Sequence, residues 1–158
     1  MSGERGFRPR ALGEIAIRCR DHEAMVSFYG ETLGLERLQP GERGGHRDGI
    51  AFFQLGESHA GHVAVLALFD AGAGGVGTGE AEGPLATGTS SSLHHIALSM
   101  PWDEQDAARS WLEARGVETS TTDFEWAGWR GLFLCDPDGN TVELVAADPA
   151  WHVPIGNR

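Results

Sequence analysis

The sequence predicts an α+β fold in which two tandem βαβββ modules form one cupped mixed sheet. Three observations support this prediction. The apolar pattern repeats once along the chain, each repeat has the pattern of a strand, a helix and then three strands, and a segment rich in Gly, Ser and Thr separates the repeats. We therefore expect a first module over residues 11–70, a linker over 71–92 and a second module over 93–148.

The repeat is visible as a nearly constant offset between matching residues. Glu14 and His95 are 81 residues apart, and three further pairs are each 82 residues apart. Four pairs of landmarks whose spacings differ by at most one residue indicate a tandem duplication. The three further pairs are Asp21 with Asp103, Gly34 with Gly116, and Gly49 with Gly131.

Each predicted helix begins at an aspartate and ends at a glycine. Asp21 and Asp103 can accept hydrogen bonds from the free amides of the first helical turn. Gly34 and Gly116 can adopt the left-handed conformation that ends a helix. Apolar residues recur at helical spacing in both helices: Met25, Phe28, Tyr29 and Leu33 in the first, and Ala107, Ala108, Trp111 and Leu112 in the second. We expect Trp111 to lie in the core.

The strands are predicted from short apolar, β-branched segments bounded by turn residues. Residues 136–140 (Asp-Pro-Asp-Gly-Asn) are a strong turn signal between the last two strands. The predicted strands cover residues 12–19, 52–55 and 63–69 in the first module, and residues 94–98, 132–135 and 141–146 in the second.

The charge balance restricts the possible partners. The chain has 23 acidic residues and 12 basic ones, a formal net charge of −11. This charge repels nucleic-acid phosphates and anionic lipid headgroups, so we expect neither nucleic acid nor membrane as a partner. All 12 basic residues are arginines, which excludes a Schiff-base lysine and the lysine of a phosphate-binding P-loop.

No targeting or membrane segment is predicted. Residues 1–10 contain three arginines but lack the apolar stretch of a signal peptide. No apolar segment approaches the roughly 20 residues that a membrane helix needs. We expect a cytoplasmic protein whose two cysteines, Cys19 and Cys135, are buried free thiols; a disulfide between them is the alternative.

Strand parity predicts a group of ligands on the sheet face that points away from the helices. This face carries Glu14, His95 and Glu143, with the small Ala16 and Ala97 beside them. Two carboxylates and an imidazole in one pocket favour a divalent cation such as Fe, Mn, Zn or Ni. Taken one by one, the two glutamates could be solvated surface residues and the histidine a hydrogen-bonded core residue; their shared face favours the metal site.

Three motifs carry a resemblance to a known family. They are His-His-Ile-Ala-Leu at residues 94–98, a Phe-Tyr pair followed by Leu-Gly-Leu within residues 28–35, and Asp-Pro-Asp-Gly-Asn-Thr-Val-Glu-Leu at residues 136–144. Over nearly all of residues 12–147 the chain resembles the vicinal oxygen chelate superfamily. This superfamily includes glyoxalase I, extradiol dioxygenases, fosfomycin resistance enzymes, methylmalonyl-CoA epimerase and bleomycin resistance proteins.

The resemblance implies a glyoxalase-like fold with metal ligands on the first and last strands of the modules. Glu14, His95 and Glu143 occupy those positions, whereas the fourth position holds the apolar Leu66 when Val65-Leu66 is aligned with Val142-Glu143. Three protein ligands with open positions resemble a dioxygenase or fosfomycin enzyme more than glyoxalase I. Glu14 then stands where those enzymes usually have histidine.

Other residues are candidates for roles around this site. His62 could be a general acid or base, or simply a histidine at the edge of a loop. Trp126 and Trp129 are predicted to wall an apolar or aromatic ligand pocket, and Arg130 to hold a ligand carboxylate. His94 has the opposite strand parity to its neighbour and is expected to be packed or partly exposed.

Two functions fit these predictions. The first is a metal-dependent enzyme that acts on a small oxygenated substrate with a carbonyl, vicinal-oxygen or catechol group, by glyoxalase-like lyase or isomerase chemistry or by extradiol-type dioxygenation. The second is a binding protein like the bleomycin resistance proteins, which would sequester a small cationic or aromatic ligand. The resemblance implies a homodimer in either case.

Overall fold

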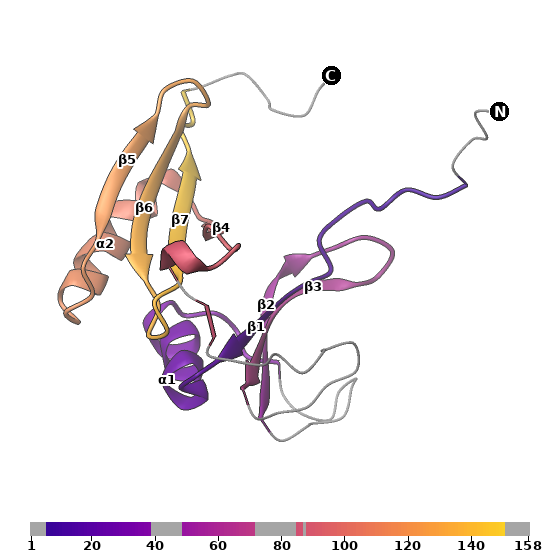
Figure 1. The fold of residues 1–158 in the computed structure, drawn as a ribbon. Coiled ribbons are helices and arrows are strands. Elements are labelled where there is room, and N and C mark those ends of the chain that lie inside the picture. The colour runs from indigo at the N-terminus through magenta and orange to yellow at the C-terminus, as the bar shows by residue number, and fades with distance from the viewer. Residues whose placement is uncertain (1–5, 39–48, 72–84, 87, 151–158) are drawn as a thin grey trace. The chain divides into compact units, whose positions relative to one another are not determined.

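The computed structural model of the chain describes residues 6–38, 49–71, 85–86 and 88–150. The chain divides into two compact units, Met1–Ala81 and Glu82–Arg158, and each unit has its own sheet and helix (Figure 1). Residues 72–84 and 87 of the predicted linker lie outside the described residues. None of the described helices is long and apolar enough to cross a membrane.

The first unit contains a three-stranded sheet with the order β1-β3-β2. Strand β1 (Glu14–Cys19) runs parallel to β3 (Val63–Asp70), and β2 (Ile50–Glu57) runs antiparallel to β3. On its other edge, β2 forms an isolated bridge between Arg37 and Phe53. With this bridge as a minimal extra strand, the unit follows the predicted βαβββ order.

The helix of the first unit follows β1 directly. It consists of α1 (His22–Ser27), continued by the π-helix η1 (Phe28–Thr32). The amide of Ala24 donates to Asp21 Oδ1 at 3.0 Å, and Gly34 ends the segment with a φ of 75°, as both residues were predicted to do. The predicted apolar stripe is confirmed for Met25, Phe28 and Tyr29, which are buried, whereas Leu33 follows the end of η1 and is half-buried.

The two faces of the first sheet differ in their surroundings. Phe53 and Leu66 pair in register and face the helix, where a Cβ added at Gly30 of η1 would lie 3.2 Å from the Phe53 ring. The opposite face carries Glu14 and Ala16 of β1, and Ala67 of β3, which pairs in register with Ala16. Burial of the helix-facing side chains holds helix and sheet together within this unit.

The second unit has a sheet of four strands, β4 (Ile96–Ser99), β5 (Ser120–Phe124), β6 (Trp129–Cys135) and β7 (Thr141–Ala147), in the order β4-β7-β6-β5. Strand β4 is parallel to β7, while β7, β6 and β5 are antiparallel neighbours. The βαβββ order predicted for this half is therefore present. Its helical elements are η2 (Gly88–Ser90), η3 (Trp102–Glu104) and α2 (Gln105–Glu113).

Helix α2 begins later than the sequence predicts. Asp103 lies in the 3₁₀ turn η3 and makes no capping hydrogen bond there. The helix starts at Gln105, whose buried side chain donates to the carbonyls of Arg130 and Leu144, both at 2.8 Å. These two bonds attach the first turn of the helix to the sheet, a tertiary contact that local sequence does not reveal. At the other end Gly116 has the predicted positive φ, 74°.

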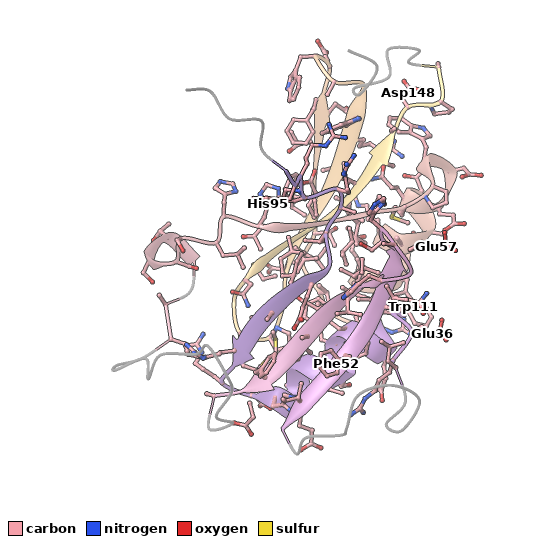
Figure 2. All side chains as sticks on the ribbon, turned by 90° about the vertical axis from the view of Figure 1, so that its right-hand side faces the viewer. Glu36, Phe52, Glu57, His95, Trp111 and Asp148 are labelled. Carbon is pink, nitrogen blue, oxygen red and sulfur yellow. The ribbon has the colours of Figure 1, made fainter. Side chains whose placement is uncertain are left out.

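The predicted second apolar stripe is partly wrong. Leu112 is buried and Ala108 is half-buried, but Ala107 is exposed, and Trp111 is 48% exposed with the Arg115 guanidinium stacked on its ring (Figure 2 labels Trp111). A cation stacked on an indole face is stable at a surface, so the ring does not need to be buried in the core.

The prediction that both cysteines are buried free thiols is partly wrong. Cys19 is buried and free, whereas Cys135 is free but exposed at the end of β6.

The turn between β6 and β7 is closed by one buried carboxylate. Asp136 Oδ1 accepts from the amides of Asp138 and Asn140 at 3.0 and 2.9 Å, and its Oδ2 accepts from Asn140 Nδ2 at 2.8 Å. Gly139 adopts a φ of 86°, which suits glycine in a tight turn. The predicted turn is therefore confirmed, and it sets the start of β7.

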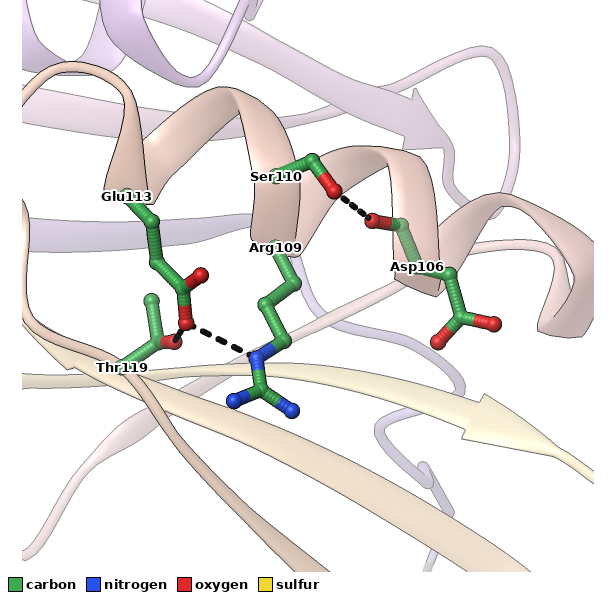
Figure 3. Close-up of polar contacts among 5 residues, drawn as sticks. All are labelled: Asp106, Arg109, Ser110, Glu113 and Thr119. Carbon is green, nitrogen blue, oxygen red and sulfur yellow. Dashed lines mark hydrogen bonds and ion pairs between the residues drawn. The ribbon is translucent and has the colours of Figure 1, made fainter.

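An ion pair near the end of α2 lowers the pKa of Glu113. Arg109 Nε donates to Glu113 Oε1 at 2.8 Å, and Thr119 Oγ1 donates to the same oxygen at 3.1 Å (Figure 3). The hydrogen bond from Arg109 is the main cause of the lowered pKa, followed by that from Thr119. The same contact raises the pKa of Arg109.

We expect this pair to contribute a small, pH-dependent stabilisation. The pKa of Glu113 is lower in the folded chain than in the unfolded one, so its contribution is fully present above the unfolded value, about 4.3. It is lost as the pH falls through the folded value. Urea unfolding should show Glu113→Gln less stable than wild type at pH 7 and equal to it at low pH, with Glu118→Gln as the charge-matched control. A difference that persists at low pH would contradict this expectation.

Candidate metal centre

The sheet of the second unit has one face toward α2 and one away from it. Arg130 marks the helix face, because its guanidinium bonds to Gln105 at the start of α2. Along β6 the alternate residues Gly131 and Phe133 lie on the opposite face, and Phe133 pairs in register with Glu143 of β7. Glu143 therefore points away from α2, as strand parity predicted.

His95 and Glu143 form the central contact on this face. His95 (labelled in Figure 2) comes immediately before β4, and Ala97 of that strand pairs in register with Glu143. The distance between His95 Nε2 and Glu143 Oε2 is 3.2 Å. The Glu143 side chain is 6% exposed and that of His95 is 34% exposed. The structure thus brings together two of the three predicted ligands.

The carboxylate of Glu143 fits because residue 131 has no side chain. A Cβ added at Gly131 would overlap Glu143 Oε1 and would lie 2.7 Å from the nearest atom of the Phe133 ring. Real Cβ atoms do not approach other atoms so closely, so any larger residue would displace one of these side chains. Gly131 was noted in the sequence only as a marker of the repeat, and its role depends on strand pairing.

His94 contacts the other side of the His95 ring. The two Nδ1 atoms are 2.7 Å apart, and the ring centroids are 4.9 Å apart in an edge-to-face arrangement. His94 is exposed, in agreement with the sequence prediction. Its hydrogen bond gives His95 a partner on each ring nitrogen.

Aromatic side chains extend from the pair along the same face. The ring of Phe133 lies edge-on to that of His95, with centroids 6.2 Å apart, and edge-on to that of Phe124, at 6.3 Å. Phe124 of β5 pairs in register with Trp129 of β6, and the ring centroids of Trp129 and Trp126 are 6.1 Å apart. Trp129 is 37% exposed and Trp126 is 75% exposed. Neither phenylalanine was predicted, because neither is distinctive before the register of β5 is known.

Arg130 lies on the face opposite Glu143 and has structural partners. Its Nε donates to Gln105 Oε1 at 2.5 Å, one Nη donates to the carbonyl of Trp102 at 3.3 Å, and the guanidinium lies 4.1 Å from the centre of the Trp102 ring. An arginine held in this way stabilises the start of α2. The geometry gives no support to the predicted role in holding a ligand carboxylate.

Glu14 and His62 belong to the first unit. Glu14 is exposed at the start of β1, and the exposed His62 precedes β3. The His62 ring lies against Gly13, where an added Cβ would be 3.5 Å from its Cε1 atom. The first unit therefore places His62 beside the residue that precedes Glu14.

The strand register corrects the predicted match between the two halves. Ala16 pairs with Ala67 in the first sheet, as Ala97 pairs with Glu143 in the second. The counterpart of Glu143 is therefore Ala67, and Leu66 instead faces the helix. The alignment of two short apolar segments was one residue out of register, which moves a side chain to the other face. The fourth position still lacks a donor.

The His95–Glu143 pair has the chemistry and spacing of two adjacent metal ligands. With metal–ligand bonds of about 2.1 Å, neighbouring ligand atoms lie roughly 3.0–3.4 Å apart. The observed distance of 3.2 Å lies in this range. Within the described part of the chain, no group of three His, Cys, Asp or Glu side chains could hold a metal ion. The described geometry therefore supplies two donors.

Comparisons with known proteins agree with this architecture. The sequence matches the model of the Glyoxalase/Bleomycin resistance protein/Dioxygenase superfamily over residues 11–144, and no curated protein matches it. A glyoxalase/dioxygenase from Nostoc punctiforme has a TM-score of 0.64 at 21% identity, covering 88% of this chain and 92% of its own. The genomically encoded fosfomycin resistance protein FosX from Listeria monocytogenes has a TM-score of 0.59 at 19% identity, covering 90% of this chain and 97% of its own. TnmS3, an antibiotic binding protein from Streptomyces sp. CB03234, has a TM-score of 0.52 at 25% identity, covering 87% of this chain and 95% of its own.

Proposed function

Because the chain belongs to the glyoxalase/bleomycin resistance protein/dioxygenase superfamily, we propose that it is a metal-dependent enzyme acting on a small oxygenated substrate. His95 and Glu143 would hold a divalent cation (Fe, Mn, Zn or Ni), with Glu14 as a third ligand. The observation that carries this proposal is the 3.2 Å contact between His95 Nε2 and the nearly buried Glu143 carboxylate. The reaction would be of the glyoxalase-like lyase or isomerase type, or an extradiol-type dioxygenation.

The residues around the pair suit such chemistry. A bound divalent cation would act as a Lewis acid on a carbonyl or hydroxyl oxygen of the substrate. Gly131 leaves room for the Glu143 carboxylate beside His95, and His94 holds the His95 ring, which reduces the reorganisation needed when a ligand binds. Burial of Glu143 excludes water from one side of the site, and this strengthens every electrostatic interaction there.

The aromatic face favours a substrate with a planar or apolar part. Phe133 adjoins the pair and Phe124 packs against Phe133, while Trp129 and Trp126 continue the aromatic surface toward solvent. Such rings contribute contact area and edge or face interactions with a second ring. We propose that they hold the non-reacting part of the substrate. His62, whose ring lies against Gly13 in the first unit, stays a predicted general acid or base on the evidence of the sequence.

Metal binding by ligand variants tests this proposal. Wild type purified without chelator or histidine tag should contain close to one equivalent of metal by elemental mass spectrometry. His95→Ala and Glu143→Gln should each weaken the affinity for Zn²⁺ or Mn²⁺ by about 100-fold or more, because each removes a ligand. Glu14→Gln should weaken it as well if Glu14 is the third ligand.

The exposed His59 supplies the matched control, because His59→Ala removes an imidazole outside the proposed site. It should bind metal like wild type. Wild type that neither contains nor takes up metal would refute the proposal. Loss of binding in His95→Ala and Glu143→Gln but not in Glu14→Gln would restrict the site to the second unit.

A binding protein without catalysis is the second candidate. The net charge of −11 favours a cationic ligand, the aromatic face could stack on one, and TnmS3 is described as an antibiotic binding protein. His95→Ala and Trp129→Ala distinguish the two functions experimentally. A pure binder should keep its ligand affinity in His95→Ala, whereas Trp129→Ala should weaken it; an enzyme should lose turnover in His95→Ala.

A further inference from the structure

Helix α2 carries a row of side chains that takes no part in the candidate metal centre. Glu104, Ala108, Trp111 and Arg115 follow one another at steps of four, three and four residues, so they lie along one side of the helix. The N-cap Glu104 and the C-cap Ala114 both have helical backbone angles, which extends this side beyond the ends of the helix itself. The four residues of the row are called the α2 seam below.

The middle of the α2 seam joins a large exposed side chain to a small one. Trp111 is exposed although the Arg115 guanidinium stacks on its ring. Ala108, one turn earlier on the seam, is half-buried and leaves room beside the indole. Tryptophan and arginine are the residues that most often carry the binding energy of protein interfaces. The composition of the seam therefore indicates a docking surface.

The two ends of the α2 seam carry opposite charges. Within the described part of the chain, neither the Glu104 carboxylate nor the Arg115 guanidinium forms an ion pair. Arg115 Nη1 donates to the carbonyl of Trp111 at 3.1 Å, and a guanidinium has further N–H donors for a carboxylate. A partner that presents its charges in the reverse order would complement both ends of the seam.

A second copy of the same seam, running antiparallel, has this reverse order. Steps of four, three and four residues read the same in both directions, so Glu104 of each copy faces Arg115 of the other. Trp111 of each copy then faces the small Ala108 of the other. In a two-fold symmetric interface every such contact occurs twice. A parallel arrangement would instead set like charges against each other.

We propose that two copies of this chain pair through their α2 seams in antiparallel orientation. The pairing leaves the candidate metal centre accessible, because α2 lies on the sheet face opposite to Glu143. A seam of this length buries less than the roughly 1,200 Å² of a stable protein interface. The dimer therefore dissociates on dilution.

Charge reversal followed by mixing tests the antiparallel order. Sedimentation velocity of the full chain over a concentration series gives the dimer dissociation constant of wild type. Glu104→Arg and Arg115→Glu should each weaken self-association by about 10-fold or more, because each variant sets like charges against each other at both ends of the paired seams. An equimolar mixture of the two variants should form dimers again, because opposite charges then face each other at both ends.

Two further variants provide the controls. Asp106→Arg changes the net charge as much as Glu104→Arg does, but residue 106 lies on a different side of the helix. It should dimerise like wild type. Trp111→Ala removes the largest side chain of the seam and should weaken self-association by about 10-fold or more. Circular dichroism should show an unchanged fold, because Trp111 is exposed.

Each outcome decides the proposal. Recovery of the dimer in the mixture supports antiparallel pairing of the two seams. Loss of the dimer in both charge variants without recovery in the mixture overturns the antiparallel order. Wild type that stays monomeric at its highest soluble concentration overturns the proposal. A dimer that the charge reversals and Trp111→Ala all leave unchanged also overturns it, because the copies then pair through another surface.

Discussion

Alanine in place of Gly131 is expected to abolish tight metal binding without unfolding the chain. An added Cβ would overlap the Glu143 carboxylate and press on the Phe133 ring, so the carboxylate must leave its place beside His95. Loss of a ligand from its position should reduce metal affinity by about 100-fold. Overpacking should also lower the free energy of unfolding by about 1–3 kcal/mol.

Titration calorimetry with zinc and urea unfolding together measure these two effects of Gly131→Ala. Gly30→Ala is the matched control, because its Cβ would meet the Phe53 ring at 3.2 Å, and both residues belong to the first unit. This control should bind zinc normally. Wild-type zinc affinity in Gly131→Ala would show that Glu143 is not a ligand. If zinc binding is lost only because the variant unfolds, the inference that Gly131 leaves room for the Glu143 carboxylate is not supported.

Asp136→Ala is expected to cause the largest loss of stability among the polar substitutions considered. The buried carboxylate accepts three hydrogen bonds in the turn before β7, from two backbone amides and the Asn140 side chain. Alanine leaves these donors buried without their acceptor, at a cost of about 2–4 kcal/mol in unfolding free energy. Because the turn fixes the start of β7, the position of Glu143 should become less well defined as well.

Tryptophan fluorescence is a suitable measurement for Asp136→Ala because all five tryptophans follow residue 100. Their unfolding transition therefore reports on the second unit. Asp106→Ala, on the exposed side of α2, removes the same charge and should shift the urea midpoint little. Equal midpoints for the two variants would show that the turn does not depend on the Asp136 carboxylate.

The sequence predicted the features that depend on local physics. The Asp21 cap, the glycines that end both helices and the 136–140 turn each follow from the conformational preference of one or a few residues, and the structure confirms all of them. The repeat then gave the βαβββ order. Strand β5 (Ser120–Phe124) was not located because it is a mostly exposed edge strand without an apolar alternation, and pairing with β6 defines it.

Features that depend on tertiary contacts were not predictable. Helix α2 starts at Gln105 because that side chain bonds to two strand carbonyls, which overrides the capping preference of Asp103. Arg130 was predicted to be a ligand-binding residue, whereas the structure places it toward the helix. Parity along a strand correctly brought His95 and Glu143 together, since alternation is a local property. The roles of Gly131 and His94 emerged only with atomic distances.

The register of the two sheets shows how the halves of the chain have specialised. Phe52, which Figure 2 labels, pairs with Ala67 in the first half, as Phe133 pairs with Glu143 in the second. The aromatic residue has been kept in both copies, whereas the acid is present in one. A larger residue at the fully buried Ala67 would disturb packing, whereas a substitution at Glu143 would change the charge beside His95. The two halves accordingly keep one fold with different chemistry at matching positions.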